Sequence, residues 1–175
     1  MSMHKLVTTV LVFLLLFLVS VLSCSKNQFK KSRSLDIQEN TTRFIEAGWN
    51  DKDVSAVDSF MAEPFIRRVN NVTTASNRKE LAANMQVYIT AFPDLHLTID
   101  DVVATEDHVI LNWTITGTNT GIFGEIQATG KKVKVTGITR MDFNESGKIV
   151  YEDVFFNELS LLQQLGHRLI PPEVE

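Results

Sequence analysis

The chain has 175 residues, and 17 Lys+Arg against 21 Asp+Glu give a formal net charge of −4 at pH 7. This mildly acidic balance argues against nucleic acid as a partner. Cys24 is the only cysteine, which excludes an intramolecular disulfide. The length suits one domain with a substantial core behind a short leader.

The first residues have the layout of a secretory signal. A basic start at His4 and Lys5 precedes an uncharged, mostly apolar run that ends at Leu22. The run is slightly short for a membrane-spanning helix, which needs about 20 apolar residues. Its ending, "VLSC", resembles a bacterial lipobox, and this resemblance implies cleavage before Cys24 and lipidation of that cysteine. An uncleaved signal anchor is the alternative.

We therefore expect a lipoprotein signal peptide over residues 1–23 and a polar, basic, lipidated tether over residues 24–34. Two or more acyl chains anchor a protein stably, whereas one holds it only marginally. The expected location is the cell envelope, with the protein bound to a membrane through its lipid. No acidic residue lies next to Cys24, which favours the outer membrane, facing the periplasm, if the cell is Gram-negative.

Helical signals come next along the chain. Ser34 can cap a first helix, and Asp53 can cap a short second helix that ends at Pro64. The following "FIRRV" is predicted to be a short strand. Asn77 begins a capping-box pattern in front of a third helix, which Pro93 stops.

From residue 95 onwards the apolar period changes from helical to alternating. Strands are predicted over residues 95–99, 109–115 and 133–143, and the turn "NESGK" leads into a last strand over 149–157. Helices followed by long antiparallel strands predict an α+β domain, with the helices packed on one face of a strongly curved sheet. Such a sheet leaves a conical pocket for a small ligand.

Motifs for the common chemistries are missing from the sequence. There is no nucleophile elbow, phosphate-binding loop, dinucleotide-binding loop or zincin motif. Beyond the leader, His96, His108 and His167 are scattered without ligand spacing. We therefore expect no metal site.

The last predicted strand carries acids among aromatic residues. One of its faces presents Tyr151, Asp153, Phe155 and Asn157. The other face presents Glu152, Val154 and Phe156. We take the first face as the one that lines the pocket, with Asp153 as the candidate acid/base. The alternatives are a solvent-facing Asp153, and an Asn157 that only caps the closing helix.

Several segments resemble the SnoaL-like polyketide cyclase group, also termed ester cyclases, of the nuclear-transport-factor-2-like superfamily. They are "AFPD", "GTNTG", "ATGKKV", "GKIV" and the closing "LLQQLG", and the likeness extends back through "FIEAGWNDKDVSAVDSFMAEPF". The resemblance implies a cone-shaped barrel whose curved, mostly antiparallel sheet packs against about three helices. We place this SnoaL-like domain at residues 35–168, followed by a C-terminal tail over 169–175.

The resemblance also implies a function. The known cyclases of the group bind a small apolar or polyketide-like molecule and close a ring by intramolecular aldol condensation, without metal or cofactor. A pocket aspartate serves as their acid/base, helped by histidine and asparagine. Proteins of this kind commonly form homodimers through the open face of the sheet.

The chain departs from the group's pattern at the site. The group's last strand typically carries Glu, Trp and Asp at the positions of Tyr151, Asp153 and Asn157, and its histidine falls at Arg68. An asparagine cannot shuttle protons at neutral pH. Two functions therefore stay open. One is ligand binding with cofactor-free acid/base catalysis of a cyclase- or isomerase-like kind. The other is a non-catalytic ligand-binding or protein-interaction module.

The candidate site residues follow from the strand pattern and the resemblance together. Asp153 and Asn157 are the catalytic candidates, and Cys24 is the lipidation site. The candidate ligand-binding residues are Trp49, Arg68, Met85, Tyr88, Trp113, Tyr151 and Phe155. For the apolar members the alternative is a place in the core, and for Arg68 the alternatives are an anionic ligand group or a surface acid.

Overall fold

The computed structural model describes residues 28–170. Residues 28–44 are helical from the first described position and continue into the π-helix η1 (Ile45–Asn50). The prediction that Ser34 caps this helix is wrong. Ser34 lies inside the helix and its hydroxyl donates to the carbonyl oxygen of Lys31 (3.0 Å). Residues 28–34, expected within a tether, are therefore helical.

Contacts distant in sequence hold this helix on the domain. The guanidinium of Arg33 donates to the carbonyl oxygens of Glu106, Asn144 and Glu145, in the two turns that follow β3 and β5. Lys30 also forms an ion pair with Glu106 (2.9 Å). Because these partners lie more than 70 residues away, local capping signals could not reveal that the helix reaches so far.

Helix α2 (Ala56–Phe60) leads directly into strand β1 (Met61–Val69), which contains the predicted "FIRRV" strand. Pro64 lies in β1, where the register with β6 shifts between Met61 and Ile66, so its missing N–H does not interrupt a regular ladder. Strand β2 (Val72–Ala75) was not predicted. It follows a two-residue turn whose asparagines, at 70 and 71, both have positive φ, the geometry of a tight hairpin.

Helix α3 (Arg78–Ala91) begins as the capping box predicts. The side-chain oxygen of Asn77 accepts from the backbone N–H of Glu80 (2.9 Å). The carboxylate of Glu80 in turn accepts from the backbone N–H of Ser76 (2.7 Å). The two bonds satisfy N–H groups that a helix N-terminus would otherwise leave free.

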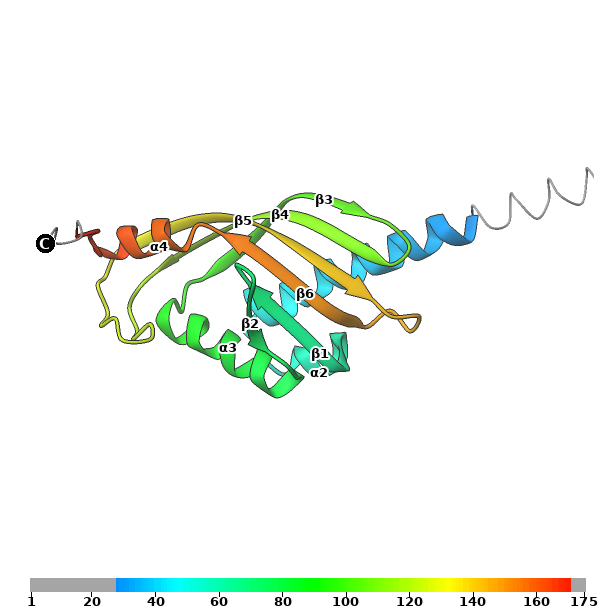
Figure 1. Cartoon of the computed structure of the whole chain (residues 1–175), viewed down its shortest axis with the longest axis horizontal. Coiled ribbons are helices and arrows are strands. Elements are labelled where there is room, and N and C mark those ends of the chain that lie inside the picture. The colour runs from blue at the N-terminus through cyan, green and yellow to red at the C-terminus, as the bar shows by residue number, and fades with distance from the viewer. Residues whose placement is uncertain (1–27, 171–175) are drawn as a thin grey trace, which may run out of the picture.

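The remaining elements are β3 (His96–Ala104), β4 (His108–Thr118), β5 (Lys132–Phe143), β6 (Ile149–Phe156) and α4 (Glu158–Leu165). The six strands form one sheet in the order β2-β1-β6-β5-β4-β3. β1 and β6 are parallel, and the other neighbours are antiparallel. Figure 1 shows the sheet curving over α2, α3 and the N-terminal helix. The predicted α+β fold with a curved, mostly antiparallel sheet is confirmed.

The core lies between the concave face of the sheet and the helices. Alternate residues of β4 and β5 point into it and are buried, as the period of two requires. They include Val109, Leu111, Trp113, Val133, Val135, Met141 and Phe143. Among residues 28–170, no helix is long and apolar enough to cross a membrane.

Candidate functional site

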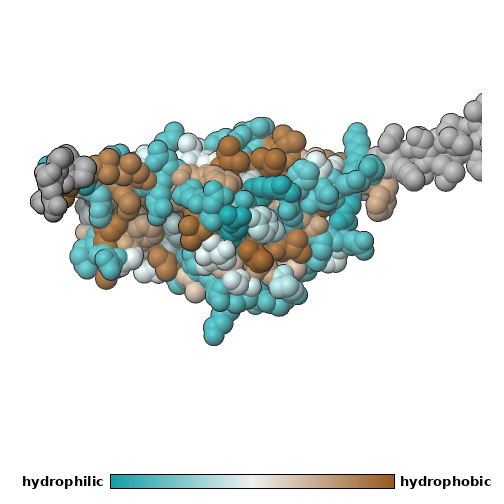
Figure 2. Space-filling view, in the orientation of Figure 1, coloured by the Kyte–Doolittle hydropathy of each residue, from teal (hydrophilic) through white to brown (hydrophobic). Residues whose placement is uncertain are grey.

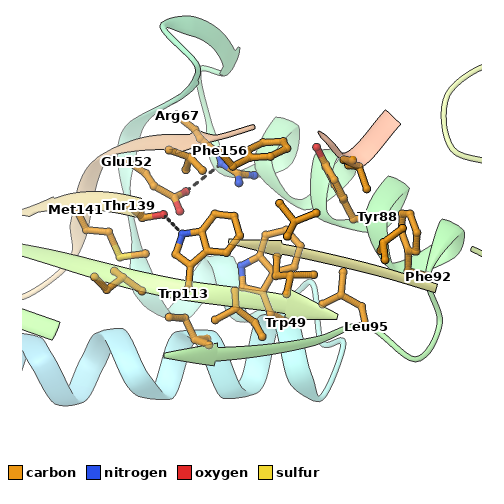
Figure 3. A pocket seen from close by; sticks show the side chains of 18 residues that line it. Trp49, Arg67, Tyr88, Phe92, Leu95, Trp113, Thr139, Met141, Glu152 and Phe156 are labelled. Carbon is orange, nitrogen blue, oxygen red and sulfur yellow. Dashed lines mark hydrogen bonds and ion pairs between the residues drawn. The ribbon is translucent and has the colours of Figure 1, made fainter. Parts of the chain in front are cut away.

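A cavity of about 70 Å³ lies in the core and is lined by residues of the sheet, η1, α3 and α4 (Figure 3). Its walls are mostly apolar, with aromatic rings from Trp49, Tyr88, Phe92, Trp113 and Phe156. The curved sheet creates this space because its inward-facing side chains cannot fill the whole cone. The described part of the chain thus contains an apolar cavity of the kind that the fold predicts.

A buried ion pair interrupts the apolar wall. Arg67 of β1 and Glu152 of β6 lie opposite each other in the sheet, and their side chains are only 8% and 5% exposed. The Nε of Arg67 lies 3.2 Å from Oε2 of Glu152. This distance makes an ion pair, but Nε and Nη1 have no hydrogen-bond partner among the described residues. The guanidinium also lies 5.7 Å from the ring centroid of Trp49.

Buried donors without partners point to a ligand or to water. An unsatisfied buried polar group costs about 1–3 kcal/mol, and more when it is charged. Arg67 offers two such donor nitrogens, Nε and Nη1, at the cavity wall. A carbonyl or other oxygen acceptor in the cavity would satisfy them, and it would gain the strength of a charge-assisted hydrogen bond.

Burial changes the acidity of two groups in the wall. It raises the pKa of Glu152 above its ordinary value of 4.5, and the positive charge of Arg67 only partly offsets this effect. Burial likewise raises the pKa of Tyr88, again with Arg67 acting in the opposite direction. A carboxyl group with a raised pKa can both accept and return a proton, which is the property of a general acid/base.

The indole of Trp113 is held in a fixed position beside this pair. Its Nε1 donates to the hydroxyl of Thr139 (2.9 Å), and both residues are buried. Gly137 leaves space for the ring, since a Cβ at that position would lie 2.3 Å from Cζ2 of Trp113. Thr139 and Gly137 together fix one wall of the cavity.

Three of the predicted ligand-binding residues line this cavity: Trp49, Tyr88 and Trp113. Figure 3 shows them around the same space as Arg67 and Glu152, although they come from η1, α3 and β4. Their contact with a ligand stays a prediction.

The other predicted members of the site lie elsewhere. Tyr151, Asp153 and Phe155 occupy the opposite face of β6 from Glu152, and Arg68 occupies the opposite face of β1 from Arg67. The expected placement of Asp153 in the pocket is therefore wrong. Tyr151 meets Arg68 on this outer face, where Nη1 of Arg68 lies 3.4 Å from its hydroxyl.

A β-bulge explains this correction. Phe143 pairs with Ile149, but the preceding Asp142 pairs with Tyr151, so Val150 is an extra residue in β6. The extra residue reverses the alternation. Ile149 is buried, and strict alternation would then have turned Asp153 inward, whereas the bulge turns Glu152 inward.

Two further candidates have structural roles. Met85 is fully buried and packs close to Gly48, but it does not line the cavity. Asn157 caps α4, since its side-chain oxygen accepts from the backbone N–H of Ser160 (2.9 Å). This was the alternative reading of Asn157.

Sequence reasoning missed Arg67 and gave Glu152 no role. The available signal was weak, because both residues neighbour an equivalent charged residue, Arg68 and Asp153 respectively. Only the register between β1 and β6 shows which arginine meets which acid inside. Within residues 28–170, no group of three or more His, Cys, Asp or Glu side chains could hold a metal ion. Cys24 lies outside the described residues.

The fold and the cavity define a cone-shaped α+β protein of the nuclear-transport-factor-2-like class with an apolar cavity in its core. The family model for SnoaL-like polyketide cyclases matches residues 39–165. The chain therefore belongs to the SnoaL-like polyketide cyclase family. This membership supports small-molecule binding or a cyclase- or isomerase-like function. No protein of established, curated function matches the chain significantly.

Solved structures with the same fold include AclR from Streptomyces galilaeus, a proposed hydroxylase. It shares 26% sequence identity over 80% of this chain and 87% of its own, with a TM-score of 0.69. A proposed SnoaL-like polyketide cyclase from Jannaschia sp. CCS1 shares 20% identity over 79% of this chain and 95% of its own, with a TM-score of 0.70. IdmH from Streptomyces antibioticus, a proposed polyketide cyclase, shares 20% identity over 74% of this chain and 98% of its own, with a TM-score of 0.62.

Proposed function

We propose that the cavity binds a small, largely apolar molecule with a carbonyl oxygen, and that Glu152 moves a proton at the carbon beside that carbonyl. The reaction is of a cyclase- or isomerase-like kind and uses no cofactor. One observation carries the proposal: a buried ion pair, with unpartnered Arg67 donors, lies in the wall of an apolar cavity.

The two charged groups have complementary tasks in this reaction. The carboxylate of Glu152 takes a proton from the α-carbon, and the C–H electron pair moves onto the carbonyl oxygen to form an enolate. The N–H donors of Arg67 stabilise the enolate oxygen. Return of the proton to a different carbon completes an isomerisation. Attack of the enolate carbon on a second carbonyl closes a ring, and the proton of Glu152 then goes to the new alkoxide.

The size of the cavity guides the choice of the first probes. Pockets for drug-sized ligands measure about 300–1,000 Å³. The cavity of about 70 Å³ is much smaller, so a multi-ring polyketide would require the walls to open. Short ketones such as 2-butanone carry the proposed oxygen and α-hydrogens within a small apolar body.

The two tryptophans of the chain make binding measurable without a label. Trp49 and Trp113 both line the cavity. A ketone that enters should therefore change the intrinsic fluorescence, and Arg67→Met should weaken this response. Titration with 2-butanone measures the effect. No saturable change with 2-butanone or with longer methyl ketones would overturn the proposal.

Proton transfer is tested by hydrogen exchange at the α-carbon in D₂O, followed by NMR. The wild type should accelerate the exchange of 2-butanone, and Glu152→Gln should lose about 10²-fold or more of this rate. Asp153→Asn is the matched control, because it neutralises the neighbouring acid on the opposite face of β6. Binding without accelerated exchange in the wild type would instead favour the non-catalytic binding module.

We also propose that the protein is lipid-anchored at Cys24 in the cell envelope, in the outer membrane facing the periplasm if the cell is Gram-negative. The support is the signal layout and the "VLSC" ending of the sequence. Labelling with a fatty acid should mark the wild type but not Cys24→Ala. An unlabelled wild type would refute the anchor.

A homodimer through the outer face of the sheet is the last part of the proposal. This face is moderately apolar, and five large apolar side chains on it are at least 41% exposed: Ile66, Val103, Ile110, Ile138 and Phe155. Exposed apolar patches of this kind often mark interaction surfaces. A second copy of the chain would cover the same patch on its partner, as two-fold symmetry requires.

A further inference from the structure

A surface groove lies directly outside the cavity. It runs between α3, the loop over residues 119–131 and α4, and Val87, Phe123, Ile126 and Leu162 give it apolar walls. Tyr88 lines both the groove and the cavity. On α4, Leu161 faces the cavity and its neighbour Leu162 faces the groove. A single layer of side chains therefore separates the two spaces.

Aromatic contacts close this layer. The ring centroids of Tyr88 and Phe123 are 5.1 Å apart, and those of Phe92 and Phe123 are 5.6 Å apart. Tyr88 also meets Trp49 edge-on at 6.2 Å. Phe123 thus packs the tip of the loop against α3. Tyr88 contacts both Phe123 and Trp49 of the cavity wall.

The tip that carries Phe123 is a small turn. The backbone N–H of Phe123 donates to the carbonyl oxygen of Ile126, and the N–H of Ile126 donates back to Phe123, each over 2.9 Å. Gly124 between them has a φ of +59°, a conformation that favours glycine. These two bonds lie within the turn and do not tie it to α3.

The base of the loop, in contrast, is held by several side-chain hydrogen bonds. Asn119 is fully buried, and its side chain donates to the carbonyl oxygens of Ala91 (3.3 Å) and Gly121 (2.8 Å). Its Oδ1 accepts from the backbone N–H and the hydroxyl of Thr129. Asp94 accepts two bonds of 2.6 Å from Thr118. The "AFPD", "GTNTG" and "ATGKKV" segments therefore form a fixed base beneath a separately held tip.

We propose that residues 123–126 form a flap over the entrance of the cavity, and that Tyr88 and Phe123 determine which ligands pass. This inference rests on the proposed function only in assuming that the cavity takes a ligand. With the flap closed, the space suits a small, uncharged, apolar molecule. Displacement of Phe123 removes the packing partner of Tyr88, the side chain that lines both spaces. Movement of Tyr88 then joins the cavity to the groove and admits a longer apolar chain. Figure 2 shows apolar side chains over α4 at this end of the molecule.

The flap can be tested without any ligand, by quenching tryptophan fluorescence with acrylamide. Trp49 and Trp113 are 6% and 5% exposed, so quenching reports how often the cavity opens. Phe123→Ala removes both aromatic contacts and should raise the Stern–Volmer constant about two- to tenfold, the effect of one or two aromatic pairs on an opening equilibrium. Phe123→Leu should give a smaller rise.

Ile122→Ala is the matched control. Ile122 precedes the flap on the same loop, is 54% exposed and lines neither the cavity nor the groove, so the quenching of Ile122→Ala should equal that of the wild type. Thermal melts of each variant ensure that only folded protein is compared, and Phe123→Leu decides the matter if Phe123→Ala does not fold. Unchanged quenching in the Phe123 variants, or an equal rise in Ile122→Ala, would overturn the flap. Since no ketone is present, this result is independent of the binding and exchange experiments.

Discussion

Strands β1 and β6 carry two arginine–acid pairs in consecutive register positions. Arg67 lies opposite Glu152, and Arg68 lies opposite Asp153. Because successive residues of a strand face opposite sides of the sheet, the first pair is in the cavity and the second is on the outer face. Arg68 bonds there with Tyr151. Of the two pairs, only Arg67 and Glu152 line the cavity, and they are therefore the candidate reactive pair.

The largest effect should come from breaking the inner pair. Arg67→Met leaves the Glu152 carboxylate buried without its cation, which should lower the free energy of unfolding by about 3–5 kcal/mol. Arg68→Met, on the outer face, should cost at most about 1 kcal/mol, because water screens that side chain. Urea denaturation of both variants measures the difference.

A double variant shows whether the unpaired charge or the altered packing lowers the stability of Arg67→Met. Replacing Glu152 as well, in Arg67→Met/Glu152→Met, removes the unpaired charge, and apolar replacements of buried ion pairs are often neutral or stabilising. The double variant should therefore recover most of the stability. A double variant as unstable as Arg67→Met would show that packing, not charge, causes the loss.

Much of the fold was predictable because its signals are local. The alternation over residues 109–115 and 133–143 predicted β4 and β5, and the capping box at Asn77 predicted the start of α3. The extent of the N-terminal helix was not predictable, since Arg33 holds it through turns more than 70 residues away. Strand β2 was missed although its two asparagines mark a tight turn.

The candidate site was predictable only in part. Large aromatic residues in the core could be expected around a pocket, and Trp49, Tyr88 and Trp113 do line it. The acid could not be assigned, because the single extra residue at Val150 decides which face of β6 turns inward. Nothing in the composition of "KIVYEDVFF" reveals that bulge.

Thr136 and Gly137 are consecutive residues of β5 and face opposite sides of the sheet. At Gly137 an added Cβ would meet Trp113 at 2.3 Å and the carbonyl oxygen of Phe155 at 2.7 Å. Gly137→Ala should therefore cost about 1–3 kcal/mol, as overpacking of a core does. Thr136→Ala, at an exposed position next to it, should change stability by about 0.5 kcal/mol or less. Equal thermal midpoints for the two variants would contradict this crowding.

A smaller effect on the free energy of unfolding is expected from the titration of Glu152 with pH. Burial raises the pKa of Glu152 above 4.5, so the native state keeps this proton where the unfolded chain has lost it. The resulting stability is fully present below pH 4.5 and falls as pH rises through the native pKa, by at most about 1.4 kcal/mol per pH unit. The unfolding free energy of the wild type minus that of Glu152→Gln should decrease over this range. An increase with pH would contradict the sign.

A substitution of Ile138, at the centre of the outer face, should have the smallest effect on the free energy of unfolding but a clear effect on dimerisation. Ile138 is 48% exposed and pairs across the sheet with Phe155 and Asn112. Ile138→Lys should change the free energy of unfolding of the monomer by about 0.5 kcal/mol or less, because the new charge stays in water. In a homodimer it would place two like charges within a symmetric apolar contact, which costs association strongly. Sedimentation at micromolar concentration should therefore show a dimer for the wild type and a monomer for Ile138→Lys. Ile122→Lys, in the loop beside the flap, is the control that should remain dimeric, and a monomeric wild type would refute the dimer.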